Sequence, residues 1–455
     1  MNTIIKYFLL LLLICFYYPQ LDIISGFSSK SLASNYYIGN NRTKIEIENS
    51  DNDIDMINLT INIINEIEKY TISSIYGLKA RKAIYREGLG VTLINNDFNI
   101  SEPNLVPKRI KIETNLPFPY GNNEPEYCMS NGVDYIFTEI DYNKLNLAVS
   151  DAFDKENEKL KRTRSVLVMY KDKIIAEKYD DKFDKNSRIH GWSMTKSITG
   201  ALFGVLQKQG KIDIYKPAPI SEWIGDERAN ITINDLLHMN SGLEWDENYK
   251  TVSDVNKMLF LETNMTKSQL IKRLQFKPNT NWKYSSGTTN LLSAILRNQF
   301  TSYQEYLDFW YSELIDKIGM HSMIIEVDMA GNYVGSSYGW ATTRDWSKFG
   351  LLYLHNGHWN GEQILDKSWI KYSTTPTNSS DGKYGAHFWL NAGGKFPDVP
   401  RDMYYCSGYR GQMIAIIPSL DMVIVRMGLQ QYPEFDLNEF LKGIISSVKH
   451  NSPNT

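Results

Sequence analysis

The stretch "HGWSMTKSITGALFGVLQKQGKID" runs from His190 to Asp213 and decides how the rest of the chain is interpreted. Its apolar residues recur at the spacing of one helical face, which predicts a helix that begins near Ser193 and enters the core. These residues are Met194, Ile198, Ala201, Leu202, Val205 and Leu206. Gly210 stands where a glycine often closes a helix. Ser193 and Lys196 are three positions apart, so their side chains share one face of the first turn.

Ser193 and Lys196 are therefore a candidate nucleophile and base. A serine hydroxyl needs an adjacent base, and a lysine can serve once burial lowers its pKa. The start of a helix also favours the negative charge that develops during acyl transfer. The S-x-x-K spacing alone is a weak signal, because it recurs at Ser368–Lys371, Ser380–Lys383 and Ser446–Lys449. Only the pair at Ser193 combines a helix start with a buried apolar stripe.

Two predicted β-hairpins flank this helix in the sequence. The first joins Ser165–Tyr170 to Ile174–Tyr179, and the second joins Gln412–Ile417 to Met422–Met427. Helical patterns begin near Asn143, fill the middle of the chain and return in "EFDLNEFLKGIISSVK" at the end. Antiparallel strands at both ends with helices between them predict an α/β (α+β) domain, in which helices flank an antiparallel sheet.

Long segments of the chain resemble one enzyme family. "SMTKSITGALFGVLQKQGKIDIYKPAPI", "ITINDLLHMNSGLEW", "FKPNTNWKYSSGTTNLLSAIL" and "SGYRGQMIAIIPSLDMVIVRMG" occur in the family's order, within about residues 143–450. They resemble serine hydrolases of the β-lactamase and penicillin-binding-protein superfamily. Within it, they are similar to the class C-like esterases and amidases that include 6-aminohexanoate-dimer hydrolases. The resemblance implies a β-lactamase/transpeptidase-like fold with an all-helical subregion.

The resemblance implies a role for each part of the site. Ser193 and Lys196 match the family's nucleophile and base, and Tyr284 in "KYSSGTTN" matches its proton-relaying tyrosine. Ser286 stands at the usual asparagine position of that motif, where it would contact substrate. The third motif falls on Cys406, Ser407 and Gly408, and the backbone N–H groups of Ser193 and Tyr409 would form the oxyanion hole.

Two departures from the family bear on the substrate. Cys406 replaces the usual lysine or histidine, and Ser286 replaces the usual asparagine, so β-lactamase activity is doubtful. The resemblance implies an exported serine hydrolase that cleaves a small ester or linear amide through an acyl-enzyme, with no metal and no organic cofactor. A D-amino-acid peptidase acting on cell-wall peptides and a catalytically silent binding protein are the alternatives. The natural substrate and the oligomeric state are left open.

Several aromatic residues near these motifs are candidates for lining an apolar cleft. They are Trp192, Trp245, Tyr249, Trp282, Trp340 and Trp389, of which Trp245 and Tyr249 are expected to contact substrate. His190 and Asp254 are expected to play structural roles beside the site. Cys406 is a rival nucleophile, but no histidine lies near it in the sequence.

The first residues predict export or membrane tethering. "MNTIIKYFLLLLLICFYYPQ" has one lysine followed by an uncharged run from Tyr7 to Tyr18, which is short for a membrane span and typical of a signal peptide. The alternatives are an uncleaved anchor that extends into "LDIISGF" and a misplaced start codon. The sequence around Cys15 is only loosely similar to a lipoprotein box, because the residue before the cysteine is usually small and Ile14 is not. We expect a leader or anchor over 1–27, an N-terminal extension of unknown role over 28–140 and the hydrolase over 141–450. Within the extension, polar residues from about 28 to 55 predict a linker.

Composition excludes several other classes of protein. The 455 residues carry a formal net charge of −3 and no basic stripe, which argues against nucleic acid as a partner. Three cysteines give no disulfide framework, and two free buried thiols are favoured over a Cys128–Cys406 bridge. His355 and His358 have a ligand-like spacing in "HNGH", but no acidic residue or cysteine lies nearby, so a surface turn is the favoured interpretation. Small-molecule chemistry is the expected function, with membrane contact only through the N-terminal segment.

Overall fold

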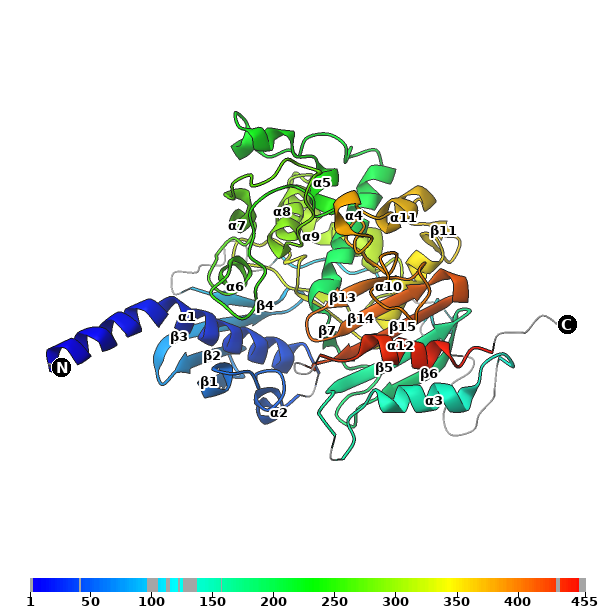
Figure 1. The fold of residues 1–455 in the computed structure, drawn as a ribbon, viewed down its shortest axis with the longest axis horizontal. Coiled ribbons are helices and arrows are strands. Elements are labelled where there is room, and N and C mark those ends of the chain that lie inside the picture. The colour runs from blue at the N-terminus through cyan, green and yellow to red at the C-terminus, as the bar shows by residue number, and fades with distance from the viewer. Residues whose placement is uncertain are drawn as a thin grey trace.

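The computed structural model describes residues 3–40, 42–95, 105–111, 115–121, 123–125, 137–156, 158–430 and 434–449. Figure 1 shows one body built around a sheet, with a long N-terminal helix along one side. Cys128 lies outside the described residues, and Cys406 is a free, buried thiol.

The central sheet has six antiparallel strands in the order β12-β13-β14-β15-β5-β6. The strands are β5 (Thr163–Tyr170), β6 (Lys173–Tyr179), β12 (Trp389–Leu390), β13 (Tyr404–Gly408), β14 (Gln412–Ile417) and β15 (Met422–Gly428). Both predicted hairpins are confirmed, as β5–β6 and β14–β15. The two pair through β15 and β5, which brings the ends of the hydrolase domain together in the middle of the sheet.

Both faces of this sheet are buried. On β5, Leu167 and Met169 point into the main core, whereas Val166 and Val168 point into a second core. Helices α3 (Tyr142–Asp151) and α12 (Leu437–Ile445) pack together over the second core. Helix α10 (Thr343–Leu354) covers the opposite face, and helix α4 (Thr195–Lys208) lies deeper in the main core. The predicted fold class is confirmed.

A largely helical region lies against the main core. Its helices are α5 (Ile233–Leu237), α6 (Asp254–Phe260), α7 (Lys267–Leu270), α8 (Ser286–Arg297) and α9 (Tyr303–Trp310), and α11 (Lys367–Thr374) lies nearby. Short strands β7 (Ile189–His190), β8 (Ile324–Ile325) and β9 (Gly339–Ala341) form a small sheet in the order β7-β9-β8. The β10–β11 hairpin (His358–Trp359 and Glu362–Gln363) contains one residue of the predicted "HNGH" turn. The small β7-β9-β8 sheet leads the chain into the nucleophile turn.

The N-terminal extension is a helix on a sheet. Helix α1 (Thr3–Tyr37) packs against a four-stranded antiparallel meander, and α2 (Lys44–Glu48) follows it. The strands are β1 (Thr60–Asn65), β2 (Tyr70–Ile75), β3 (Leu78–Arg86) and β4 (Gly90–Ile94). The first part of α1 projects beyond the rest of the molecule (Figure 1). Among the helices of the described part of the chain, none is both long and apolar enough to cross a membrane.

The interface between α1 and its sheet combines apolar contacts with buried polar groups. Ser28 Oγ donates to Asn62 Oδ1 at 3.0 Å, and the hydroxyls of Ser29 and Thr71 are 2.9 Å apart. These groups are buried, so each needs the partner that it finds across the interface. The predicted linker over about 28–55 is therefore wrong, because α1 continues through this segment to Tyr37, α2 follows it, and several of its polar residues, such as Ser28, Ser29 and Asn52, are buried. The expected boundary between residues 27 and 28 falls inside one continuous helix.

Glu326 joins the extension to the hydrolase domain. It is fully buried, and its carboxylate accepts hydrogen bonds from Lys30 Nζ at 2.6 Å and Ser34 Oγ at 2.8 Å, both on α1. The same carboxylate accepts from Val91 N in β4 and from Trp340 Nε1 in β9, each at 2.9 Å. The extension is therefore folded against residues 141–450 and is tied to them by buried charge.

Candidate active site

Ser193 lies in a tight turn between β7 and α4. The turn is a single 3-10 segment, Trp192–Met194, and α4 starts at Thr195, within two residues of the predicted helix start. Trp192 has a φ of +49°, in the left-handed region that non-glycine residues rarely occupy. A Cβ on Gly191 would lie 2.3 Å from the Trp346 ring, so only glycine fits there. The turn leaves Ser193 partly exposed above a buried helix.

Lys196 points from the first turn of α4 back to Ser193. Its Nζ lies 3.1 Å from Ser193 Oγ, 2.9 Å from Ser286 Oγ and 2.8 Å from the Ser336 carbonyl oxygen. The side chain is buried, and this burial lowers the pKa of Lys196 to about 8, although the charge of Glu247 acts in the opposite direction. A fraction of the amine is therefore neutral near pH 7 and can accept a proton.

Tyr284 completes the group around the nucleophile. Its ring centroid lies 4.9 Å from Lys196 Nζ. Burial raises the pKa of Tyr284 above its ordinary value, the charge of Glu247 raises it further, and a hydrogen bond with the Ser193 side chain has the opposite effect. The phenol is thus protonated at neutral pH. In this arrangement Lys196 is the better proton acceptor, and Tyr284 is the better donor.

The carboxylate of Glu247 accepts several hydrogen bonds on the side of the site away from the nucleophile. It accepts from Ser286 Oγ at 2.5 Å, Ser286 N at 2.9 Å and Tyr249 Oη at 3.1 Å. It also accepts from Trp245 Nε1 at 2.5 Å. Ser286 therefore donates to Glu247 and accepts from Lys196, which links the carboxylate to the amine. This chain of hydrogen bonds fixes the position of the Lys196 side chain.

The end of β13 passes directly beside the nucleophile turn. A Cβ on Gly408 would lie 2.2 Å from the Gly191 carbonyl oxygen, so this close approach requires glycine. Ser407, Gly408 and Tyr409 are all partly exposed here. The Tyr409 ring stacks on Tyr249 at 5.3 Å. The backbone at Tyr409 is thus next to Ser193, where an oxyanion donor is needed.

A family model described as Beta-lactamase matches residues 154–442. The chain belongs to the beta-lactamase family. It is 22% identical over 304 residues to the 6-aminohexanoate-dimer hydrolase of Paenarthrobacter ureafaciens, covering 60% of this chain and 74% of that protein. A putative 6-aminohexanoate-dimer hydrolase from Bacillus anthracis superposes with a TM-score of 0.55 at 21% identity, over 64% of this chain and 79% of the other. A family VIII carboxylesterase gives 0.53 at 15% identity, over 69% and 97%.

As a beta-lactamase family member, the chain is a serine hydrolase. Its three motifs converge in space: Lys196 and Tyr284 both contact Ser193, and β13 lies beside the turn that carries it. The family match covers the hydrolase domain and leaves the N-terminal extension outside it.

Two residues expected to contact substrate are buried. Ser286 is fully buried between Lys196 and Glu247, and Trp245 is buried with its indole N–H on Glu247. Their polar groups are used within the protein, which assigns them a positioning role. Tyr249 is partly exposed and stacks on Tyr409 in this beta-lactamase family member.

The remaining candidates have structural surroundings. Burial raises the pKa of the Cys406 thiol to about 12, so it is not a thiolate at neutral pH and does not rival Ser193. His190 is buried between Trp192 and Trp340, with ring centroids 4.2 and 4.5 Å away, and burial lowers its pKa to about 3. Asp254 opens α6 and accepts from Lys272 Nζ at 2.7 Å.

The other aromatic candidates lie beside Tyr409, Tyr284 or His190. Trp192 meets Tyr409 edge-on at 5.4 Å, and Trp389 lies 5.2 Å from Tyr284. Trp282 packs on Trp389, whereas Trp340 is buried against His190. The sequence analysis missed Glu247. It could have been found from its position in the sequence, because this acidic residue lies between Trp245 and Tyr249, the two aromatic residues expected to contact substrate.

Proposed function

We propose that this chain hydrolyses small esters or linear amides through an acyl-enzyme on Ser193. One observation carries the proposal: the buried Lys196 amine lies 3.1 Å from a partly exposed Ser193 hydroxyl. A hydroxyl becomes an effective nucleophile when such a base is in contact with it. The names of the similar proteins, an amide hydrolase and a carboxylesterase, support this substrate range.

The reaction follows from the positions of three side chains. Neutral Lys196 accepts the Ser193 proton while Ser193 Oγ attacks the carbonyl carbon. The oxyanion is held by the backbone N–H groups of Ser193 and Tyr409, and one such donor is typically worth about 3–4 kcal/mol. Tyr284, which is protonated, gives its proton to the leaving oxygen or nitrogen and recovers one from Lys196. Water then attacks the acyl-enzyme by the same route, which releases the acid and restores Ser193.

Lys196 is poorly placed to hold a β-lactam carboxylate, because its amine is already engaged by three protein oxygens. The position where relatives carry a cation in the third motif is Cys406, whose thiol is buried and uncharged. We therefore place β-lactams among the poor substrates.

A substrate panel with adduct mapping tests this function. The purified protein is expected to hydrolyse p-nitrophenyl esters or short linear oligoamides faster than nitrocefin. A fluorophosphonate probe is expected to add to Ser193, which mass spectrometry locates on the tryptic peptide Ile189–Lys196. Turnover of D-alanyl peptides alone would assign the peptidase alternative. A protein that takes up no probe and turns over no substrate would be a binding protein instead.

We also propose that the chain is exported and held at a membrane by about its first 20 residues. The run Tyr7–Tyr18 is uncharged, and Ile5, Tyr7, Phe8 and Leu10 are exposed on the projecting part of α1. Packing of α1 against the enzyme begins near Ile23. Fractionation of cells that express the full chain is expected to place it outside the cytoplasm, in the membrane fraction. Recovery in the cytoplasmic fraction would reject this localisation.

A further inference from the structure

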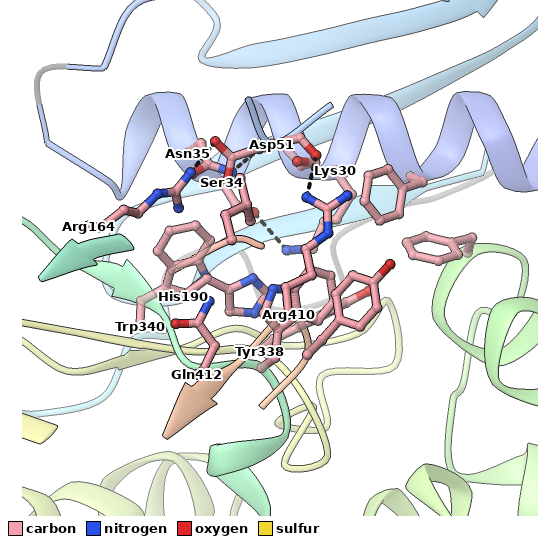
Figure 2. Close-up of a pocket in the computed structure, with 16 residues that line it drawn as sticks. Lys30, Ser34, Asn35, Asp51, Arg164, His190, Tyr338, Trp340, Arg410 and Gln412 are labelled. Atoms are coloured by element: carbon pink, nitrogen blue, oxygen red, sulfur yellow. Dashed lines mark hydrogen bonds and ion pairs between the residues drawn. The ribbon is translucent and has the colours of Figure 1, made fainter. Parts of the chain in front are cut away.

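Helix α1 contacts the residues that support the nucleophile turn. A small cavity lies at this contact, and Figure 2 shows Lys30 of α1 beside it together with Tyr338 and Trp340 of the hydrolase domain. Phe27, three residues before Lys30 on α1, lines the same cavity, as does Trp192 of the nucleophile turn. The extension, which the family match does not cover, therefore borders the turn that carries the nucleophile.

Phe27 is the first link between α1 and this turn. Its ring stacks 6.5 Å from that of Trp192 and meets Phe260 edge-on at 5.4 Å. The φ of +49° at Trp192 is a strained conformation, which persists only where the surroundings hold it. His190 and Tyr409 of the hydrolase domain also place their rings against Trp192. Phe27 adds the support that comes from the extension.

Lys30 is the second link. Its ammonium lies 2.6 Å from the Glu326 carboxylate and 4.1 Å from the centroid of the Tyr338 ring. Glu326 also accepts a hydrogen bond from Trp340 Nε1 at 2.9 Å. All four side chains are buried, so loss of the ammonium would leave an uncompensated charge that water does not reach. Lys30 thus contacts Tyr338 directly and reaches Trp340 through Glu326.

The segment 336–340 leads from these contacts to the catalytic pair. The Ser336 carbonyl oxygen accepts from Lys196 Nζ at 2.8 Å, so this segment helps to hold the base. The Gly339 carbonyl oxygen accepts from Gly191 N at 2.9 Å, at the start of the nucleophile turn. One short stretch of backbone therefore holds both halves of the catalytic pair, and α1 packs on its far end.

We propose that α1 is part of the catalytic apparatus, with Phe27 and Lys30 as positioning residues that hold Ser193 and Lys196 in the geometry for acyl transfer. The proposal rests on the proposed hydrolase function and gives the N-terminal extension a role. Phe27 acts on the nucleophile turn, and Lys30 acts through the segment 336–340. A nucleophile misplaced by about 1 Å can lose roughly 100-fold in rate, so small movements of the turn have large effects.

A substitution at Phe27 tests the first link. Phe27→Ala is expected to lower kcat for a p-nitrophenyl ester by about 10-fold or more, with KM within about twofold of wild type. The loss falls on kcat because the missing ring supports the turn rather than the substrate. Fluorophosphonate labelling of Ser193 is expected to slow by a similar factor. Phe27→Leu keeps an apolar side chain at the contact and is expected to recover most of the rate.

Ile24→Ala is the matched control on the same helix. Ile24 is also buried, but its neighbours Ile57 and Ile75 lie within the extension, so this variant loosens α1 without touching the turn. It is expected to keep the kcat of wild type when every variant is assayed well below its unfolding temperature. Wild-type kcat in Phe27→Ala, or an equal loss of kcat in Ile24→Ala, would overturn the role of Phe27.

A pair of variants tests the second link. Lys30→Met is expected to lower both thermal stability and kcat, because Glu326 loses its counter-charge. Lys30→Met combined with Glu326→Gln removes both charges and is expected to regain stability while kcat stays low. Full kcat in the double variant would overturn the role of Lys30. Where Lys30→Met does not fold, the double variant and the Phe27 series decide the question.

The wild-type protein separates this proposal from the function on which it rests. If wild type neither hydrolyses esters nor takes up the fluorophosphonate, the hydrolase function itself fails. If wild type reacts and the variants at Phe27 and Lys30 react equally fast, the hydrolase stands and only the role of α1 is rejected.

Discussion

Ser193→Ala is expected to reduce kcat/KM for a p-nitrophenyl ester by about 10⁴-fold or more and to abolish labelling by a fluorophosphonate. The loss is large because no acyl-enzyme can form without the Ser193 oxygen. The base and the proton donor of the site then have no serine hydroxyl to act on. Steady-state assays and adduct mass on the Ile189–Lys196 peptide measure both effects. The small change in volume leaves the turn intact, so thermal unfolding is expected to stay within a few degrees of wild type.

The chain supplies a matched control for this variant. Ser368 and Lys371 repeat the S-x-x-K spacing on α11, but both are exposed. Ser368→Ala is expected to retain full activity, since this serine lies on an exposed helix face with no buried lysine beside it. Substantial ester hydrolysis by Ser193→Ala would place the nucleophile elsewhere.

Lys196→Ala is expected to lower kcat/KM by roughly 10³–10⁵-fold, because Ser193 loses the base that accepts its proton. Lys196→Arg is expected to be similarly inactive, since a guanidinium keeps its charge and cannot accept a proton. Lys371→Ala is the matched control and is expected to behave as wild type. Full activity in Lys196→Arg would mean that the charge, rather than proton transfer, is what the reaction needs.

The pH profile of the wild-type enzyme supplies the signature of this base. Burial lowers the pKa of Lys196 to about 8, and only the neutral amine accepts a proton. For a neutral ester, kcat/KM is therefore expected to rise with pH, about tenfold per unit below pH 7, and to level off above about pH 8. A profile that is flat between about pH 6 and 9 would contradict the assignment.

The hydrolase fold could be predicted because its signals are local. The strands β5 and β15 place apolar residues on both faces of the sheet, and the turns between the hairpin strands fall where Lys171, Asp172 and Asp421 adopt positive φ. The stripe on α4 marks its buried face directly in the sequence. Each of these patterns is complete within a few residues, so it needs no knowledge of distant partners.

The extension could not be predicted in the same way. Ser28, Ser29 and Lys30 form part of a polar stretch, which by itself is typical of a linker. They are buried because Asn62, Thr71 and Glu326 meet them, and those partners are far away in the chain. Glu247 was not predicted for the same reason, since its role depends on contact with Ser286, which is distant in the sequence.

Because α1 is one continuous helix, a cut in it is tolerated only in the part that does not pack against the rest of the protein. Ser28, Ser29 and Lys30 lie on the same helix as the uncharged run Tyr7–Tyr18, and they are anchored to the sheet and to Glu326. A cut in α1 beyond residue 24 would therefore remove the buried Ile23 and Ile24, and a cut beyond Lys30 would also leave the Glu326 carboxylate without its counter-charge. If the chain is cut near its N-terminus, the cut is therefore expected to fall within the projecting first part of this single helix.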